Sequence, residues 1–448
     1  MLTSSGMSDK RSFKFVIIFL IVVVLVVLVI DFSYKPSVFK SSYYSINVSS
    51  SYNNNKNNGS LGKDNNTYLN KVVLYKNYNL PFFSRPVETG DFSFIDTANY
   101  FQTYGVSNPN YQGSVVKIDN QNGKIVWQTD LPNLVMNTPL VLPEINKVIV
   151  GIGNDEFFKS HSKLIRGTGT SGIYALDIET GKILWKFPTV GQRKPTLVYK
   201  NNTIYSVGGN GVLYAISASN GKELWSYNYG SYTSQGSLTL VGDNLYFGGA
   251  HPYKLFDFNI KTRKITWSDD LGKSYGINGG LDDTTIAYGN GSLYTVATKL
   301  VNKKQNKGYD YLFKINAKNG DIVWNLNEGY GLINLPNGAQ MEGTVPTITN
   351  NKVYIGSTTA QKIYAVNSNT GKIIWAKTAS GLNNKPFVIL NKFLYYDNGL
   401  GDIYVYNRFN GRYLAERTTG GQVAVSGLTY FDGRFFADTS NGHFFIFK

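Results

Sequence analysis

The sequence predicts an all-β protein built as an eight-bladed β-propeller. Two observations lead to this prediction: an eleven-residue frame that recurs seven times, and a composition poor in helix formers. The 448 residues include 46 glycines, 33 tyrosines and 26 phenylalanines, while only 16% of the residues are charged. Such a chain favours short strands joined by tight turns.

The recurring frame has the form of a strand, a tight turn and the start of a second strand. Its clearest copy runs from Ala175 to Trp185 (ALDIETGKILW). The glycine of the frame supplies the positive φ angle that the turn requires, and Arg263 replaces it in the fourth copy. The chain's six tryptophans all occupy the last position of the frame, at Trp127, Trp185, Trp225, Trp267, Trp324 and Trp375. The seventh copy ends at Ala415 and has lost its tryptophan.

The spacing of the frames predicts the number of blades. Successive tryptophans lie 58, 40, 42, 57 and 51 residues apart, and two further strand-like runs lie between copies. A four-stranded unit near 40 residues with loop insertions is typical of a propeller. After Ala415 three strands remain, and the segment from Lys71 to Tyr75 can supply the fourth. The count is therefore eight blades; seven is the alternative, because the first unit (83–127) is the least regular.

The N-terminal segment predicts a membrane anchor. Residues 15–30 are apolar without interruption, and residues 13–32 would cover about 30 Å as a helix, enough to span a bilayer. No small-x-small cleavage site follows, which favours an uncleaved anchor over a signal peptide. We expect a cytoplasmic N-terminus at 1–14, a transmembrane signal anchor at 15–32, a disordered Ser/Asn-rich linker at 33–70 and the propeller at 71–448.

Charge predicts the location and the partners. Lys10, Arg11 and Lys14 precede the apolar run, so the positive-inside rule places the propeller outside the cell. We therefore expect a single-pass protein of the cell membrane, which the chain contacts through residues 15–32. The net charge of +15 comes largely from lysines repeated in the turns. This distribution favours anionic head groups, glycans or acidic proteins, and we expect no nucleic-acid partner.

Several kinds of chemistry are excluded by the residues that the chain lacks. It has no cysteine, which rules out disulfides, thiolate zinc sites and cysteine nucleophiles. Its three histidines, His161, His251 and His443, are too far apart in sequence to form a local metal motif.

The frame Ala-x-Asp-x-x-Thr-Gly-Lys-x-x-Trp at 175–185 resembles the tryptophan-docking motif of pyrroloquinoline-quinone (PQQ)-type propellers. The resemblance covers residues 71–448 and implies that each tryptophan packs between two blades. Within that superfamily, quinoprotein alcohol dehydrogenases bind PQQ and a calcium ion on the propeller axis. Other members are non-enzymatic, such as the lipoprotein of the bacterial outer-membrane assembly machine, and act as protein-binding scaffolds.

One stretch resembles the dehydrogenases. Residues 148–157 (VIVGIGNDEF) are similar to the quinoprotein segment that carries a calcium-ligating glutamate. This resemblance implies Glu156 and Asp282 as calcium ligands and Arg166 as a residue near the quinone. The chain departs from the pattern because it lacks the adjacent cysteines whose disulfide stacks on the quinone. It also has no tryptophan outside the docking positions for the opposite face of the quinone.

These observations together predict a membrane-anchored, extracytoplasmic propeller that acts as a binding scaffold for protein or glycan partners. In this interpretation no cofactor and no catalytic residue are expected. The alternative is a PQQ- and calcium-dependent dehydrogenase of alcohols or sugars. A purely structural envelope protein is the third interpretation.

Overall fold

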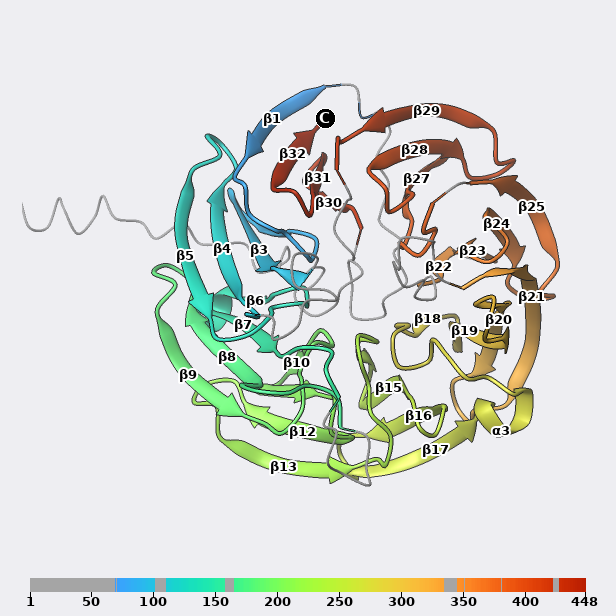
Figure 1. The fold of residues 1–448 in the computed structure, drawn as a ribbon, viewed down its shortest axis with the longest axis horizontal. Coiled ribbons are helices and arrows are strands. Elements are labelled where there is room, and N and C mark those ends of the chain that lie inside the picture. The colour runs from blue at the N-terminus through green and yellow to red at the C-terminus, as the bar shows by residue number, and fades with distance from the viewer. Residues whose placement is uncertain are drawn as a thin grey trace, which may run out of the picture. The chain divides into compact units, whose positions relative to one another are not determined.

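The described part of the chain is a ring of eight β-sheets. The computed structural model describes residues 69, 71–100, 110–157, 165–333, 345–349, 351–379, 381–421 and 427–448. In these residues each sheet has four antiparallel strands, and the sheets surround a central axis as blades (Figure 1). The predicted eight-bladed propeller is confirmed, and the seven-bladed alternative is wrong.

The inner half of each blade consists of a short strand at the axis and a longer second strand. The first strands of blades 1 to 8 are β2 (Val87–Thr89), β6 (Leu140–Leu142), β10 (Val198–Lys200), β14 (Thr239–Val241), β18 (Ala287–Gly289), β22 (Thr347–Thr349), β26 (Val388–Leu390) and β30 (Thr429–Phe431). The second strands are β3 (Phe92–Ala98), β7 (Lys147–Ile152), β11 (Thr203–Ser206), β15 (Asn244–Gly249), β19 (Ser292–Asn302), β23 (Lys352–Ser357), β27 (Phe393–Asp397) and β31 (Arg434–Asp438).

The outer half of each blade contains the repeated frame. The third strands are β4 (Gly113–Asp119), β8 (Gly172–Asp177), β12 (Val212–Ser217), β16 (Lys254–Asn259), β20 (Lys307–Asn316), β24 (Lys362–Asn367), β28 (Asp402–Asn407) and β32 (His443–Phe447). The outermost strands are β5 (Ile125–Leu131), β9 (Ile183–Pro188), β13 (Glu223–Asn228), β17 (Lys264–Asp270), β21 (Ile322–Leu332), β25 (Ile373–Thr378), β29 (Tyr413–Thr418) and β1 (Val72–Asn77). The described residues also include two short helical turns, η1 (Pro143–Ile145) and α3 (Leu271–Tyr275).

Blade 8 closes the ring with strands from both ends of the propeller. Strand β1 pairs antiparallel with β32, so that Val72 lies opposite Phe447 and Asn77 lies opposite His443. The prediction that the segment after Lys71 supplies the missing outer strand is confirmed.

The repeated frame folds as the sequence predicts. In its clearest copy the Gly181 N–H donates to the Asp177 carbonyl at 2.9 Å, and Gly181 has a φ angle of 72°. The Asp177 carboxylate accepts a hydrogen bond from the Thr180 N–H at 2.8 Å, which closes the turn. A Cβ on Gly181 would lie 2.7 Å from the indole of Trp127 in the preceding blade. Glycine therefore serves both the turn and the docking of the tryptophan.

Tryptophan docking joins neighbouring blades. Trp127 donates its indole N–H to the Ile178 carbonyl of the next blade at 3.1 Å, and four other tryptophans make the equivalent bond. Trp127 also packs in one apolar cluster with Phe94 of its own blade and with Val148 and Leu176 of the next. The apolar core therefore lies between blades, and each sheet is stabilised by its neighbours.

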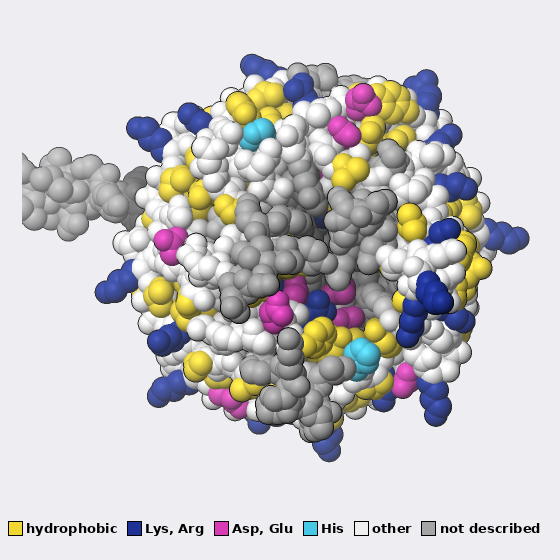
Figure 2. Space-filling view, viewed as in Figure 1, with side chains coloured by type: hydrophobic (Ala, Val, Ile, Leu, Met, Phe, Trp, Pro, Cys, Tyr) yellow, Lys and Arg dark blue, Asp and Glu magenta, His cyan; other side chains and the backbone are white. Residues whose placement is uncertain are grey.

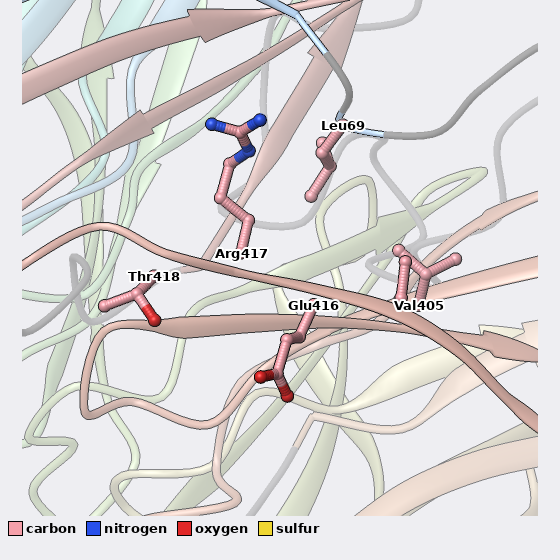
Figure 3. A pocket seen from close by; sticks show the side chains of 6 residues that line it. Leu69, Val405, Glu416, Arg417 and Thr418 are labelled. Carbon is pink, nitrogen blue, oxygen red and sulfur yellow. The ribbon is translucent and has the colours of Figure 1, made fainter.

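Blade 7, whose copy of the repeated frame has lost its tryptophan, packs differently from blades 1 to 6. Ala415, at the tryptophan position of blade 7, lies in an apolar cluster with Leu69, which is 5% exposed. Leu69 and residues of β28 and β29 line a surface depression at this place (Figure 3). A residue from before β1 therefore packs where blade 7 lacks its large aromatic side chain.

Antiparallel pairing sends successive connections to alternate ends of each blade. We call one end the site face; it carries the connections between second and third strands, such as residues 153–171, and those between blades, such as residues 189–197. The opposite end is the turn face, which carries the turns of the repeated frame, such as residues 178–182.

The membrane anchor predicted at 15–32, the N-terminus at 1–14 and most of the linker at 33–70 lie outside the described residues. Within the described residues no helix is both long and apolar enough to cross a bilayer.

Candidate functional site

Three buried aspartates occupy the same position in three neighbouring blades. Asp96, Asp397 and Asp438 lie toward the site-face end of the second strands of blades 1, 7 and 8, and each is at most 1% exposed. In three other blades this position is glycine, at Gly151, Gly248 and Gly356. A Cβ on Gly151 would lie 1.8 Å from the carbonyl oxygen of Arg193, so these blades have no room for a side chain. Blades 7, 8 and 1 accommodate carboxyl groups instead.

The environment of these carboxyl groups favours their neutral form. Burial raises the pKa of Asp96 to about 8 and that of Asp397 to about 6. Burial also raises the pKa of Asp438 well above its ordinary value, and the nearby Asp96, Asp397 and Glu88 raise it further. Among the described residues neither carboxyl oxygen of Asp438 has a hydrogen-bond partner, whereas Asp96 Oδ1 accepts from the Ser84 N–H at 2.8 Å. A buried acid of this kind is a candidate functional group.

Buried cations accompany the carboxyl groups. Arg85 and Lys385 each precede a proline in the segment that leads into the first strand of a blade, and they are 3% and 1% exposed. Lys and Arg side chains are rarely buried to this degree unless an anion is near. The charge of Lys385 lowers the pKa of Asp397 against the effect of burial. We call Arg85, Asp96, Lys385, Asp397 and Asp438 together the carboxyl sector.

A second charged cluster lies on the site face of blades 2 to 5, and we call it the Arg166 sector. Arg166 Nε lies 3.2 Å from Asp155 Oδ1, and Arg166 Nη1 lies 3.8 Å from Asp282 Oδ2. The same Asp155 oxygen forms an ion pair with Lys194, whose side chain is fully buried. Burial opposes ionisation of Asp155, but the charges of Lys194 and Arg166 outweigh it and hold the pKa of Asp155 below its ordinary value.

Backbone contacts hold Arg166 between blades 2 and 3. Its N–H donates to the Gly209 carbonyl and its carbonyl accepts from the Gln192 N–H, both at 2.9 Å. Gly209 permits this approach, because a Cβ there would lie 1.8 Å from the Arg166 carbonyl oxygen.

Aromatic side chains surround the Arg166 sector. The guanidinium of Arg166 lies over the ring of Phe157, with 5.3 Å between the guanidinium carbon and the ring centroid. Phe157 contacts Tyr232 edge to face, and Tyr232 in turn contacts His251, with centroids 5.8 and 5.7 Å apart. Figure 2 shows acidic and basic side chains gathered at the central hollow of the propeller, with hydrophobic and histidine side chains beside them.

The structure brings together two of the three site residues that the sequence singled out. Asp282 lies beside Arg166, whereas Glu156 is exposed and accepts a hydrogen bond from the Tyr111 hydroxyl at 2.7 Å. Among the described residues no group of three His, Cys, Asp or Glu side chains is placed to hold a metal ion. Calcium takes six to eight oxygen ligands, which is more than the carboxyl groups of Glu156 and Asp282 supply together. Glu156 and Asp282 as calcium ligands and Arg166 as a quinone contact stay predictions.

Sequence reasoning missed the carboxyl sector. Two signals point to it in blades 1 and 7: a Lys-Pro or Arg-Pro pair ahead of the first strand, combined with an aspartate near the end of the second strand, where three other blades have glycine. Both signals can be recognised only after the sequences of the blades have been aligned strand by strand.

Comparison with known proteins gives three kinds of relative. A curated relative, the tetrathionate hydrolase of Acidithiobacillus ferrooxidans, is 29% identical over 375 residues, which cover 78% of this chain and 72% of the relative. The solved structure of BamB from Moraxella catarrhalis is similar with a TM-score of 0.58 and 13% identity, covering 84% of this chain and 99% of that one. Quinohemoprotein alcohol dehydrogenase from Comamonas testosteroni is similar with a TM-score of 0.62 and 11% identity, covering 91% and 81%. At such low identity these two structures establish the fold alone.

A family model supplies the assignment. The model described as outer membrane protein assembly factor BamB matches residues 111–299 and 309–426, which is more than half of the chain. The matched residues include most of the blades and all six docking tryptophans. The chain therefore belongs to the family described as outer membrane protein assembly factor BamB, and its blades are PQQ-type propeller repeats.

Proposed function

We propose that this propeller is a hydrolase that cleaves a sulfur-chain dianion of the tetrathionate class on its site face. The observation that carries the proposal is the carboxyl sector, where three buried acids with raised pKa values occur and the buried Lys385 acts on one of them, Asp397. The choice of substrate is supported by the 29% identity to a tetrathionate hydrolase over most of the chain. The proposal differs from the scaffold that the sequence alone favoured.

The chemistry requires charge neutralisation and proton transfer. Tetrathionate carries a sulfonate at each end of a short sulfur chain. Attack of water on one sulfonate sulfur forms an S–O bond and breaks the adjacent S–S bond. The products are hydrogen sulfate and disulfane monosulfonate: the departing sulfur takes one proton, and the other stays on the sulfate. Catalysis therefore needs cations for the sulfonates and a proton donor for the departing sulfur.

The carboxyl sector offers both groups. In acid its three aspartates are neutral, so Arg85 and Lys385 set its charge and favour a dianion. Asp438 is our choice of proton donor, because its carboxyl oxygens have no hydrogen-bond partner among the described residues. A protonated carboxyl at this position can pass its proton to the departing sulfur.

The test is a tetrathionate hydrolysis assay with the purified full-length protein between pH 3 and pH 8. We expect the wild type to consume tetrathionate and release sulfate, and Asp438→Asn to lower kcat by at least about 100-fold, the usual scale for losing a general acid. Asp432→Asn is the matched control, because Asp432 is exposed in a turn of the same blade on the opposite face. Absence of hydrolysis by the wild type over the whole pH range would contradict the proposal.

A protein-binding scaffold is the second candidate, and exposed apolar side chains on the site face favour it. Val190, Leu400 and Phe157 lie in site-face connections and are 59%, 48% and 39% exposed. Family membership also supports a scaffold function, since the family takes its description from an assembly factor of the outer membrane. Crosslinking from a photoreactive residue at position 190 in intact cells tests it. A discrete partner band that is lost in Leu400→Ser, with hydrolysis absent, would favour the scaffold over the enzyme.

A further inference from the structure

A β-bulge recurs near the start of the outermost strand in every blade. The pairing of the third with the fourth strand skips one residue of the fourth strand at this place. In six blades the skipped residue is aliphatic and 43% to 52% exposed: Val73, Val126, Leu184, Leu224, Val323 and Ile374. Exposed edge strands usually carry charged side chains at such points. These bulges instead place a ring of aliphatic side chains near the turn face.

Exposed cations stand beside the aliphatic ring. The last residue of the repeated turn is an exposed Lys or Arg in six blades, at Lys124, Lys182, Lys222, Lys264, Lys372 and Arg412. Over the whole turn face the turns contain about twice as many Lys and Arg as Asp and Glu residues. Figure 2 shows Lys and Arg side chains projecting around the circumference of the ring.

The chain enters the propeller on this same face. The Lys71 N–H donates to the Lys448 carbonyl at 3.0 Å, and β1 begins at Val72, opposite the end of β32. The first strand of the described ring therefore begins at the turn face, and the sequence that precedes it contains the apolar run at 15–32. The sequence that leads from the predicted anchor at 15–32 is therefore connected to the ring at the turn face.

From the aliphatic ring, the turn cations and the entry point of the chain, we infer that the turn face docks on an anionic lipid surface. Basic side chains contact the head groups, and the six aliphatic side chains reach the interfacial region, as in other peripheral membrane proteins. The site face then points away from the bilayer, open to solutes. This inference is independent of the proposed hydrolase activity.

Fluorescence quenching on vesicles tests the docked orientation. The chain has no cysteine, so one cysteine introduced at Asn369 on the turn face or at Val190 on the site face takes a single label. Full-length protein is reconstituted in vesicles of phosphatidylcholine alone or with 30 mol% phosphatidylglycerol, both carrying a head-group quencher. We expect the label at Asn369 to be quenched at least about twofold more strongly in the anionic vesicles, and 0.5 M salt to reverse this difference. The label at Val190 stays unquenched.

Charge reversal tests whether the lysines of the turn face cause the docking, as opposed to a general attraction of the basic protein to anionic lipid. Lys124→Glu, Lys182→Glu and Lys372→Glu combined are expected to abolish the quenching at Asn369. The matched control reverses Lys303, Lys304 and Lys307, which lie in the β19–β20 hairpin of the site face, and is expected to leave it unchanged. Equal quenching in neutral and anionic vesicles, quenching at Val190, or no quenching at either position would overturn the inference. Thermal denaturation of each variant confirms that it folds.

Discussion

Arg263 lies over the indole ring of Trp225, with 5.7 Å between the guanidinium carbon and the ring centroid. It occupies the turn position where the other six copies of the frame have glycine, and it adopts the left-handed φ of 54° that the turn demands. A cation–π contact of this kind stabilises by about 0.5–1 kcal/mol at an exposed site, which offsets part of the cost of the left-handed backbone.

This relationship predicts different responses to alanine at equivalent turn positions. Gly221→Ala places a Cβ within 2.6 Å of the docked Trp185 and is expected to lower the free energy of unfolding by about 2–3 kcal/mol. Arg263→Ala loses only the cation–π contact, and we expect a loss of about 1 kcal/mol or less. Urea denaturation of the two variants measures the difference. Equal losses would show that the glycine is not needed for docking.

The contact between Leu69 and Ala415 predicts that the Leu69 side chain stabilises the ring. Leu69→Ala removes a buried side chain from the cluster at blade 7, so we expect a loss of about 2–3 kcal/mol in the free energy of unfolding. Leu184→Ala is the matched control, because Leu184 is 45% exposed and its loss is expected to change stability by about 0.5 kcal/mol at most. The expectation fails if the two substitutions have the same effect in denaturant titrations.

The buried ion pair of the Arg166 sector predicts a strong coupling between two substitutions. Asp155→Asn leaves Lys194 buried without its anion, and we expect a loss of about 3–5 kcal/mol. Lys194→Met removes the buried charge, so the double variant is expected to recover much of that stability. A double-mutant cycle by chemical denaturation measures the coupling. Additive losses would mean that the two side chains do not depend on each other.

The buried carboxyl groups predict that stability falls as the pH rises from about 4 to 8. Burial raises the pKa of Asp96 and Glu88 to about 8, of Asp257 to about 7 and of Asp397 to about 6. Since unfolded carboxyls titrate near pH 4, these groups stabilise the fold fully below that pH. Their contribution is lost as the pH rises through each folded pKa. Asp155 has the opposite effect on stability. Because its pKa is lowered in the folded protein, it stabilises the fold above the ordinary carboxyl pKa, and this stabilisation is lost as the pH falls into stronger acid.

Denaturant titrations from pH 3 to 8 check this dependence. We expect the free energy of unfolding to be greatest near pH 4 and to decline toward pH 8. Asp96→Asn removes one of the groups and is expected to flatten the decline, whereas the exposed Asp432→Asn leaves it unchanged. A free energy of unfolding that increases from pH 4 to pH 8 would refute the expectation.

Much of the fold is predictable because the eleven-residue frame contains both the residues that form the turn and the residue that packs between blades. The frame at 175–185 contains the strand alternation, the turn glycine and the docking tryptophan in eleven residues, and it recurs often enough to count blades. The lost tryptophan at Ala415 is visible in the sequence, but its compensation by Leu69 is not. Contact between these two residues depends on how the ring closes, which brings together segments about 350 residues apart.

The candidate site is predictable only in part. The resemblance singles out Arg166 and Asp282, and these two residues do lie together. The second acid that pairs with Arg166 is Asp155 and not its neighbour Glu156. The carboxyl sector has no local sequence signature, because no motif joins Asp96, Asp397 and Asp438. Each looks like the end of an ordinary strand until the blades are aligned.

The sequence by itself determined the eight blades, the docking of their tryptophans and the closure by the segment after Lys71, since these follow from local turn chemistry and a repeated spacing. Only the tertiary structure decided which charged residues meet at the axis. The circular arrangement places blade 8 beside blade 1, so Asp438 lies near Asp96 despite their distance in the chain. Burial at that point changes the protonation of both groups, and no local pattern encodes burial by distant neighbours.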